Sequence, residues 1–149
     1  MPMAEANPRL ERMLQVLKDK GQRLTPQRIA ILKILAQDDR HPGIEEIYAA
    51  LQDDFPTSSL ATVYKTIHLL QENREVLELN FSGLGKRYDG FRPYPHPHAV
   101  CMACGRIMES GEIELTPLTA EVARQTGYRI THHQLNFYGL CPACQQAKK

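Results

Sequence analysis

Two Cys-x-x-Cys pairs constrain this chain of 149 residues more than any other feature of its sequence. The first pair is Cys101 and Cys104, and the second is Cys141 and Cys144 near the C-terminus. Four thiolates satisfy a tetrahedral zinc ion and leave no coordination position open, which is the arrangement of a structural site. The pattern therefore predicts a structural zinc ion that ties together two segments far apart in the sequence.

Other uses of cysteine have to be weighed against zinc. Inert buried cysteines are one alternative, and a thioredoxin-like redox pair at Cys141 and Cys144 is another, although such a pair is normally single and begins a helix after a strand. A base deaminase needs His-x-Glu and Pro-Cys-x-x-Cys, whereas this chain has His96-Pro97-His98 and places Leu140 before its second pair. The chain is expected not to be an enzyme, and a zinc-containing redox or metal-handling enzyme is the alternative from another class.

Composition bears on the cellular compartment of the protein, and the compartment decides whether paired cysteines are expected to bind metal or to form disulfides. The chain is 42% hydrophobic and 23% charged, and no apolar run approaches the roughly 20 residues that span a membrane. Residues 1–5 are polar and acidic, unlike a secretory signal. We therefore expect a cytoplasmic protein without membrane contact, where paired cysteines bind metal more often than they form disulfides. The formal charge of +1 neither favours nor excludes nucleic acid.

Apolar residues recur at helical spacing in four segments of the first half of the chain. The expected helices run from about residue 8 to 20, from 26 to 35, from 44 to 51 and from 59 to 71. Thr25, followed by a proline, is a good N-cap residue for the second helix, and the N-cap candidates for the fourth helix are Thr57, Ser58 and Ser59. The apolar stripe of the fourth helix is expected to comprise Leu60, Val63, Ile67 and Leu70.

The opposite face of the fourth helix has the chemistry of a DNA-reading surface. Its small, polar and basic residues fit a major groove, with one tyrosine at the boundary; they are Ala61, Thr62, Tyr64, Lys65 and His68. Residues 76–81 and 86–89 are expected to form a hairpin behind this helix. Helices followed by a hairpin favour a winged helix-turn-helix with an extra leading helix, and a plain helical bundle with a hairpin remains the alternative.

The second half of the chain has a different organisation. Residues 91–95 are rich in proline and aromatic residues and indicate a linker. Short strands are expected on either side of the first cysteine pair, at 99–101 and 106–108, followed by a helix over 116–127 and a strand over 128–138. The chain as a whole is thus expected to be α+β.

A second metal site is indicated just ahead of the first cysteine pair. His96 and His98 would point to one face of a strand, and with carboxylates they could hold iron, manganese or zinc. Asp89, Glu109 and His41 are the candidate partners. Each alone is explained more simply as a surface polar group, but together they come from three segments that one metal could draw together.

Four segments resemble the Fur family of metal-dependent bacterial regulators, in the same order and spacing and over nearly the whole chain. They are residues 21–28, 59–64, 96–105 and 138–144. The resemblance implies an N-terminal winged-helix DNA-binding domain over 1–90, a hinge over 91–97, and a C-terminal α/β dimerisation and metal-binding domain over 98–149 that carries the four-cysteine zinc.

The resemblance also implies a homodimeric repressor that binds a palindromic double-stranded DNA operator and takes no small organic ligand. Its regulatory metal, Fe²⁺ or Mn²⁺ with Zn²⁺ possible, would be held by His41, Asp89, His96, His98 and Glu109. Tyr64 would contact bases in the major groove, and Arg23 would approach the minor groove. Metal bound to both domains would close the hinge and set two recognition helices about 34 Å apart.

The signal is expected to be peroxide or iron, as in the peroxide-sensing, PerR-like branch of the family. There, ferrous iron reacts with peroxide and oxidises ligand histidines, which correspond to His41 and His96. Peroxide sensors typically carry Asp where this chain has Glu109, so an iron-sensing Fur or a zinc-sensing Zur is the alternative. The family's extra metal site keeps His133 but has Pro97 and Thr116 in place of carboxylates, so we predict one regulatory site per subunit.

Overall fold

The computed structural model describes residues 7–37, 41–94 and 96–147. The chain divides into two compact units, Met1–Pro93 and Tyr94–Lys149. Pro95 of the predicted hinge lies outside the described residues. Helices and small sheets occur in both units, which confirms the α+β class.

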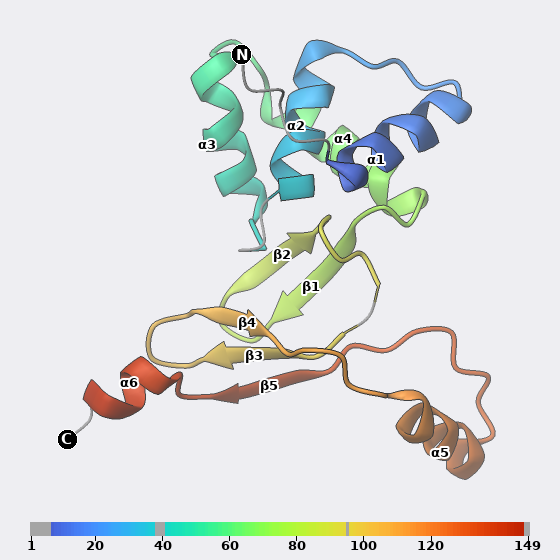
Figure 1. Cartoon of the computed structure of the whole chain (residues 1–149). Coiled ribbons are helices and arrows are strands. Elements are labelled where there is room, and N and C mark those ends of the chain that lie inside the picture. Colours follow the sequence, from blue (N-terminus) through green and yellow to red (C-terminus); the bar gives the residue numbers. More distant parts are fainter. Residues whose placement is uncertain (1–6, 38–40, 95, 148–149) are drawn as a thin grey trace. The chain divides into compact units, whose positions relative to one another are not determined.

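In its described residues, the first unit contains four helices and a hairpin (Figure 1). The helices are α1 (Pro8–Asp19), α2 (Pro26–Gln37), α3 (Ile44–Asp54) and α4 (Leu60–Glu72), and the antiparallel strands are β1 (Leu77–Phe81) and β2 (Gly85–Asp89). Thr25 accepts a hydrogen bond from the Arg28 N–H, and Ser59 accepts one from the Thr62 N–H. These contacts confirm the predicted starts of α2 and α4. Helices followed by a two-stranded wing make this unit a winged helix.

The core of the first unit is built from the apolar faces of its four helices. Each fully buried aliphatic side chain contributes roughly 1.5–3 kcal/mol relative to exposure. The apolar helical residues that are at most 2% exposed are Met13, Leu17, Ile31, Leu32, Leu35, Ala36, Ile47, Leu51, Val63, Ile67 and Leu70. The prediction for Leu60 was wrong, since it is 41% exposed, while Thr66 is buried. Leu60 is the first residue of α4 and lies ahead of the turn that packs on the core.

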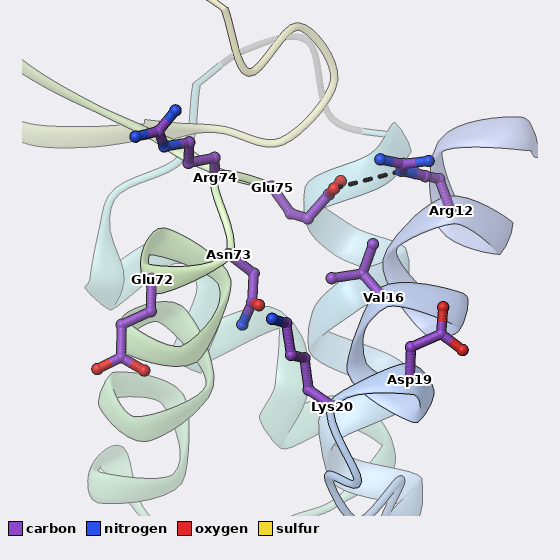
Figure 2. Close-up of a pocket in the computed structure, with 8 residues that line it drawn as sticks. All are labelled: Arg12, Val16, Asp19, Lys20, Glu72, Asn73, Arg74 and Glu75. Carbon is purple, nitrogen blue, oxygen red and sulfur yellow. Dashed lines mark ion pairs between the residues drawn. The ribbon is translucent and has the colours of Figure 1, made fainter.

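Helix α1 holds both ends of the hairpin. The Arg9 guanidinium donates to the Gly90 carbonyl at 2.9 Å and to the Glu75 carboxylate at 2.9 Å. Arg12 forms a second ion pair with Glu75 at 3.5 Å, beside a pocket of about 380 Å³ between α1 and the end of α4 (Figure 2). Glu75 precedes β1 and Gly90 follows β2, so α1 fixes where the wing begins and ends. A Cβ at Gly90 would lie 2.9 Å from the Leu35 Cβ, which explains the glycine.

The second unit is a three-stranded sheet with two short helices. Its strands are β3 (His98–Cys101), β4 (Ile107–Glu109) and β5 (Asn136–Gly139), in the order β4-β3-β5. Strand β3 pairs antiparallel with β4 and parallel with β5. The helices are α5 (Thr116–Thr126), which was predicted, and α6 (Pro142–Ala147), which was not. The predicted strand over 128–138 was wrong in extent, because only residues from Asn136 onward pair with β3.

The second unit buries little apolar surface of its own. Pro97, Val100 and Cys101 are its buried apolar residues among those the structure describes. Helix α5 buries none and stands apart from the sheet in Figure 1. Large apolar side chains are exposed instead, among them Met108, Ile113, Leu118, Val122, Phe137 and Tyr138. Within the described ranges, no helix is long and apolar enough to cross a membrane.

Candidate metal centres and nucleic-acid interface

The four cysteines of the second unit form one cluster. Cys101 ends β3, and parallel pairing places it opposite Gly139 of β5, just ahead of Cys141. One sulfur atom from each of the four cysteines lies within 4.8 Å of the others, and the Sγ atoms of Cys104 and Cys141 are 3.8 Å apart. Zinc–sulfur bonds of about 2.3 Å in a tetrahedron place the sulfurs roughly 3.8 Å apart. The cluster therefore fits a structural zinc ion.

Main-chain N–H groups stabilise the thiolate form of Cys101, which is the form that binds a cation. The Sγ of Cys101 accepts hydrogen bonds from the N–H groups of Cys104 at 3.5 Å and Cys141 at 3.4 Å, and these bonds lower the pKa of Cys101 to about 6. Hydrogen bonding with the other sulfurs, first that of Cys141, raises the pKa of Cys144 to about 12. Gly105, at φ +75°, closes the turn by donating to the Cys101 carbonyl at 2.9 Å. All four cysteines are thiols, and the convergence of two pairs argues against a single redox pair.

A second set of candidate ligands lies at the start of β3. Antiparallel register places His98 opposite Glu109 of β4. The Nε2 atoms of His96 and His98 lie 3.0 Å and 3.9 Å from the Glu109 Oε1 atom, and the two imidazole rings are 4.4 Å apart. His96 and His98 are 7% and 1% exposed. The strand prediction for His96 was wrong, since β3 begins at His98, yet both imidazoles approach the same carboxylate.

The orientation of His96 comes from a main-chain group that no side-chain pattern could reveal. Its Nδ1 atom lies 2.6 Å from the Tyr94 carbonyl oxygen, which can only accept a hydrogen bond. Nδ1 therefore carries the proton in this contact, and Nε2 faces Glu109. A hydrogen bond of this kind orients the histidines that bind metals.

The first unit contains a separate imidazole–carboxylate pair. The Nε2 atom of His41 lies 3.2 Å from the Oδ2 atom of Asp89, and each residue is 1% exposed. The other oxygen of Asp89 accepts hydrogen bonds from the N–H groups of Phe91 at 3.0 Å and Arg92 at 2.7 Å. These bonds fix the carboxylate and turn its Oδ2 atom toward His41.

The predicted DNA-contacting residues also lie in the first unit. Tyr64 of α4 is 54% exposed, and Lys65 and His68 are exposed on the same helix, although the His68 Nε2 atom lies 3.0 Å from the Glu72 carboxylate. Thr62 is half-buried beside the Ser59 cap. Arg23 is exposed between α1 and α2. Helix α4 thus presents an aromatic and a cationic side chain to the outside, as a reading helix requires.

Comparisons with known proteins agree with this architecture. The model of the Ferric uptake regulator family matches residues 19–138. The peroxide operon regulator of Bacillus subtilis (strain 168) is 38% identical over 137 residues, which cover 92% of this chain and 94% of that protein. The structure of the Campylobacter jejuni peroxide stress regulator is 34% identical with a TM-score of 0.70, covering 88% of this chain and 98% of that one.

The Helicobacter pylori ferric uptake regulator Fur is 25% identical with a TM-score of 0.77, and the match covers 100% of both chains. The matches span both units, since the family model covers residues 19–138 and the ferric uptake regulator structure matches the whole chain. The chain therefore belongs to the Ferric uptake regulator family.

Proposed function

We propose that this protein is a metal-dependent transcriptional repressor of the peroxide-responsive type, which acts by binding double-stranded DNA rather than by catalysis. The observation that carries the proposal is the pair of buried ligand sets, one in each unit: His41 with Asp89, and His96 and His98 with Glu109. The names of its relatives, which include a peroxide operon regulator, support the same class. A repressor of bacterial genes acts in the cytoplasm.

A single Fe²⁺ or Mn²⁺ ion is proposed to take ligands from both sets. Three imidazoles and two carboxylates suit these metals, whereas a structural zinc ion is satisfied by the four thiolates. The first unit supplies two donor groups and the second supplies three, so neither set alone completes the coordination sphere. An ion shared by His41 and His98 joins the two units across residues 91–97, which act as the hinge.

A second copy of the chain is proposed to cover the apolar surface of the second unit. A groove of about 240 Å³ on this sheet is lined by apolar side chains that include Val100, Met108 and Phe137. Burying such a surface in a homodimer is favourable by about 25 cal/mol per Å² of apolar area. The dimer carries two copies of α4, as a palindromic operator requires.

Metal binding then selects the DNA-binding form. Two recognition helices read successive major grooves only when they are about 34 Å apart. A hinge that moves freely samples many separations, and a metal that favours one of them shifts the population toward the form that binds DNA. In that form, Tyr64 and Lys65 reach base edges and phosphates in the major groove, and Arg23 approaches the minor groove.

Selection from a random pool of duplex DNA tests this function and identifies the operator in the same experiment. Zinc-loaded protein with Mn²⁺ is expected to enrich an inverted repeat. The variant Lys65→Ala should bind the enriched duplex about tenfold more weakly because it loses phosphate or base contacts. Lys33→Ala is the matched control, since Lys33 is an exposed lysine on α2. Equal losses in both variants, or no enriched sequence, would contradict the assignment of α4 as the reading helix.

A peroxide response is also proposed. Bound ferrous iron would activate hydrogen peroxide, so that one oxygen atom is added to an imidazole, which is oxidised by two electrons, and the other oxygen leaves as water. Protein loaded anaerobically with Fe²⁺ and then given hydrogen peroxide is expected to gain one oxygen atom on peptides that carry His41 or His96. Peptide mass spectrometry detects the added mass, and DNA binding should fall in parallel. Unmodified histidines with DNA binding retained would instead support an iron-sensing or zinc-sensing regulator. That result would agree with the presence of Glu109 where peroxide sensors typically carry the shorter Asp.

A further inference from the structure

Strand β2 is bonded to the segment that carries His41. Besides the imidazole–carboxylate contact between His41 and Asp89, the Tyr88 N–H donates to the Pro42 carbonyl at 3.0 Å. The Arg87 guanidinium donates to the main-chain carbonyl of His41 at 3.3 Å. Three successive residues of β2 thus contact residues 41–42, and all of these contacts lie within the first unit.

The side chain of Arg87 makes the contacts that extend furthest along this segment. The same Nη1 atom lies 3.0 Å from the Oε1 atom of Glu46, and that carboxylate oxygen also accepts from the Gly43 N–H at 3.4 Å. Arg87 and Glu46 therefore close a bridge over residues 41–43, from the wing to the first turn of α3. The Arg87 side chain is 23% exposed, so solvent competes with these contacts only in part.

The backbone of His41 adopts a conformation that these contacts stabilise. Its φ of +58° lies in the left-handed region, which residues other than glycine seldom adopt and which persists where surrounding contacts hold it. A relaxation of this φ would swing the imidazole away from Asp89. The carbonyl that Arg87 holds belongs to the same residue, so the contact acts directly on the strained backbone.

We propose that Arg87 is a positioning residue for the regulatory metal: it holds His41 in its ligand orientation through the main-chain carbonyl and does not touch the metal. This inference rests on the proposed function, because it assumes that His41 is a metal ligand. It adds a side chain of the wing, the element next to the reading helix, to the machinery that binds the metal.

The sign of the effect distinguishes positioning from simple electrostatics. A guanidinium near a cation site repels the cation, so the loss of its charge alone would tighten metal binding. Loss of a group that orients a ligand instead weakens metal binding, typically by about 10–100-fold. The two explanations therefore predict opposite changes for the same substitution.

The experiment compares Arg87→Met with Lys86→Met in the full-length, zinc-loaded protein. Lys86 is the matched control, because it precedes Arg87 in β2 and its side chain is 63% exposed, with an ion pair to Glu78 at 3.7 Å rather than a side-chain contact to residues 41–43. Free Mn²⁺ is measured by electron paramagnetic resonance. Arg87→Met should bind Mn²⁺ about 10–100-fold more weakly than Lys86→Met, which should match the unsubstituted protein.

Two further readouts keep the result specific. Without Mn²⁺, amide hydrogen exchange over residues 41–47 should be faster in Arg87→Met than in Lys86→Met. At saturating Mn²⁺, the two variants should bind the selected duplex equally, because each has lost one positive charge of the wing. Arg87→Lys, which keeps the charge and one donor group, should give an intermediate Mn²⁺ affinity, and it serves as the test variant if Arg87→Met does not fold.

Mn²⁺ affinity in Arg87→Met that equals or exceeds that of Lys86→Met would overturn the proposal. Failure of the proposed function looks different, since the unsubstituted protein would then bind no Mn²⁺ beyond its structural zinc. Even in that case, equal hydrogen exchange over residues 41–47 in the two variants would overturn the positioning role itself.

Discussion

Replacement of Cys104 by serine is expected to release the structural zinc and to unfold residues 94–149, while residues 1–93 stay folded. The two units differ in the interactions that stabilise their folds. The buried helical cluster lies entirely in the first unit, whereas the buried apolar residues described in the second are Pro97, Val100 and Cys101. Structural zinc contributes on the order of 10–16 kcal/mol in small zinc domains, more than so small a core supplies.

Zinc content and thermal unfolding measure this outcome. Cys104→Ser should contain no tightly bound zinc and should lose one of two unfolding transitions, together with the dimer. Ala103→Ser is the matched control, because residue 103 is an exposed member of the same turn and not a member of the sulfur cluster. A dimer of normal stability in zinc-free Cys104→Ser would contradict the structural role of the metal.

Omission of the regulatory metal is expected to lower the affinity for the selected duplex by about 100-fold or more. The expected size comes from avidity, since engagement of two half-sites instead of one strengthens binding by about 10²–10⁴-fold when the geometry allows it. Fluorescence anisotropy with zinc-loaded protein, with and without Mn²⁺ at one fixed salt concentration, measures the change. The fixed salt matters because phosphate contacts make affinity depend steeply on ionic strength.

Mg²⁺ at the same concentration is the control for general effects of a divalent cation on DNA. It prefers oxygen ligands, so it should not replace Mn²⁺ at a site rich in imidazole. A duplex with a single half-site should show a much smaller response to Mn²⁺. Equal stimulation by both cations, or by Mn²⁺ on both duplexes, would show that the metal does not act by fixing two recognition helices.

The first unit could be predicted almost completely from the sequence, because its signals are local. Thr25 caps α2 as expected, and Ser59 is the one of three candidates that caps α4. The apolar spacing of Met13 and Leu17 matches their burial. The exposure of Leu60 shows the limit of the method. An apolar residue at the right spacing joins the core only if a neighbouring element covers that turn of the helix.

The second unit was harder to predict because its order depends on distant partners. Strand β5 pairs in parallel with β3, far away in the sequence, and alternation over 128–138 does not show where that pairing begins. The amphipathic pattern of Leu118 and Val122 predicted a helix correctly, yet both residues are exposed in a single chain. A pattern identifies an apolar face but not the surface that covers it.

The two candidate metal centres also differ in how much of their geometry could be predicted from the sequence. Cysteine spacing alone predicted the zinc cluster, because each Cys-x-x-Cys pair is local and the thiolate chemistry is distinctive. The approach of His98 to Glu109 depends on the register of β3 and β4, which spacing does not give. The supports of the ligands, such as the Tyr94 carbonyl and Arg87, escaped prediction because they act on or through main-chain atoms.

The most direct test of the central claim, that one metal takes ligands from both units to control DNA binding, compares one ligand variant from each unit. Mn²⁺-dependent binding of the selected duplex is measured for His41→Ala, His98→Ala and, as control, His132→Ala, in which an exposed histidine outside both ligand sets is replaced. We predict that both ligand variants keep their zinc and lose the Mn²⁺ response, while the control keeps both. A full Mn²⁺ response in His41→Ala or in His98→Ala would contradict the account.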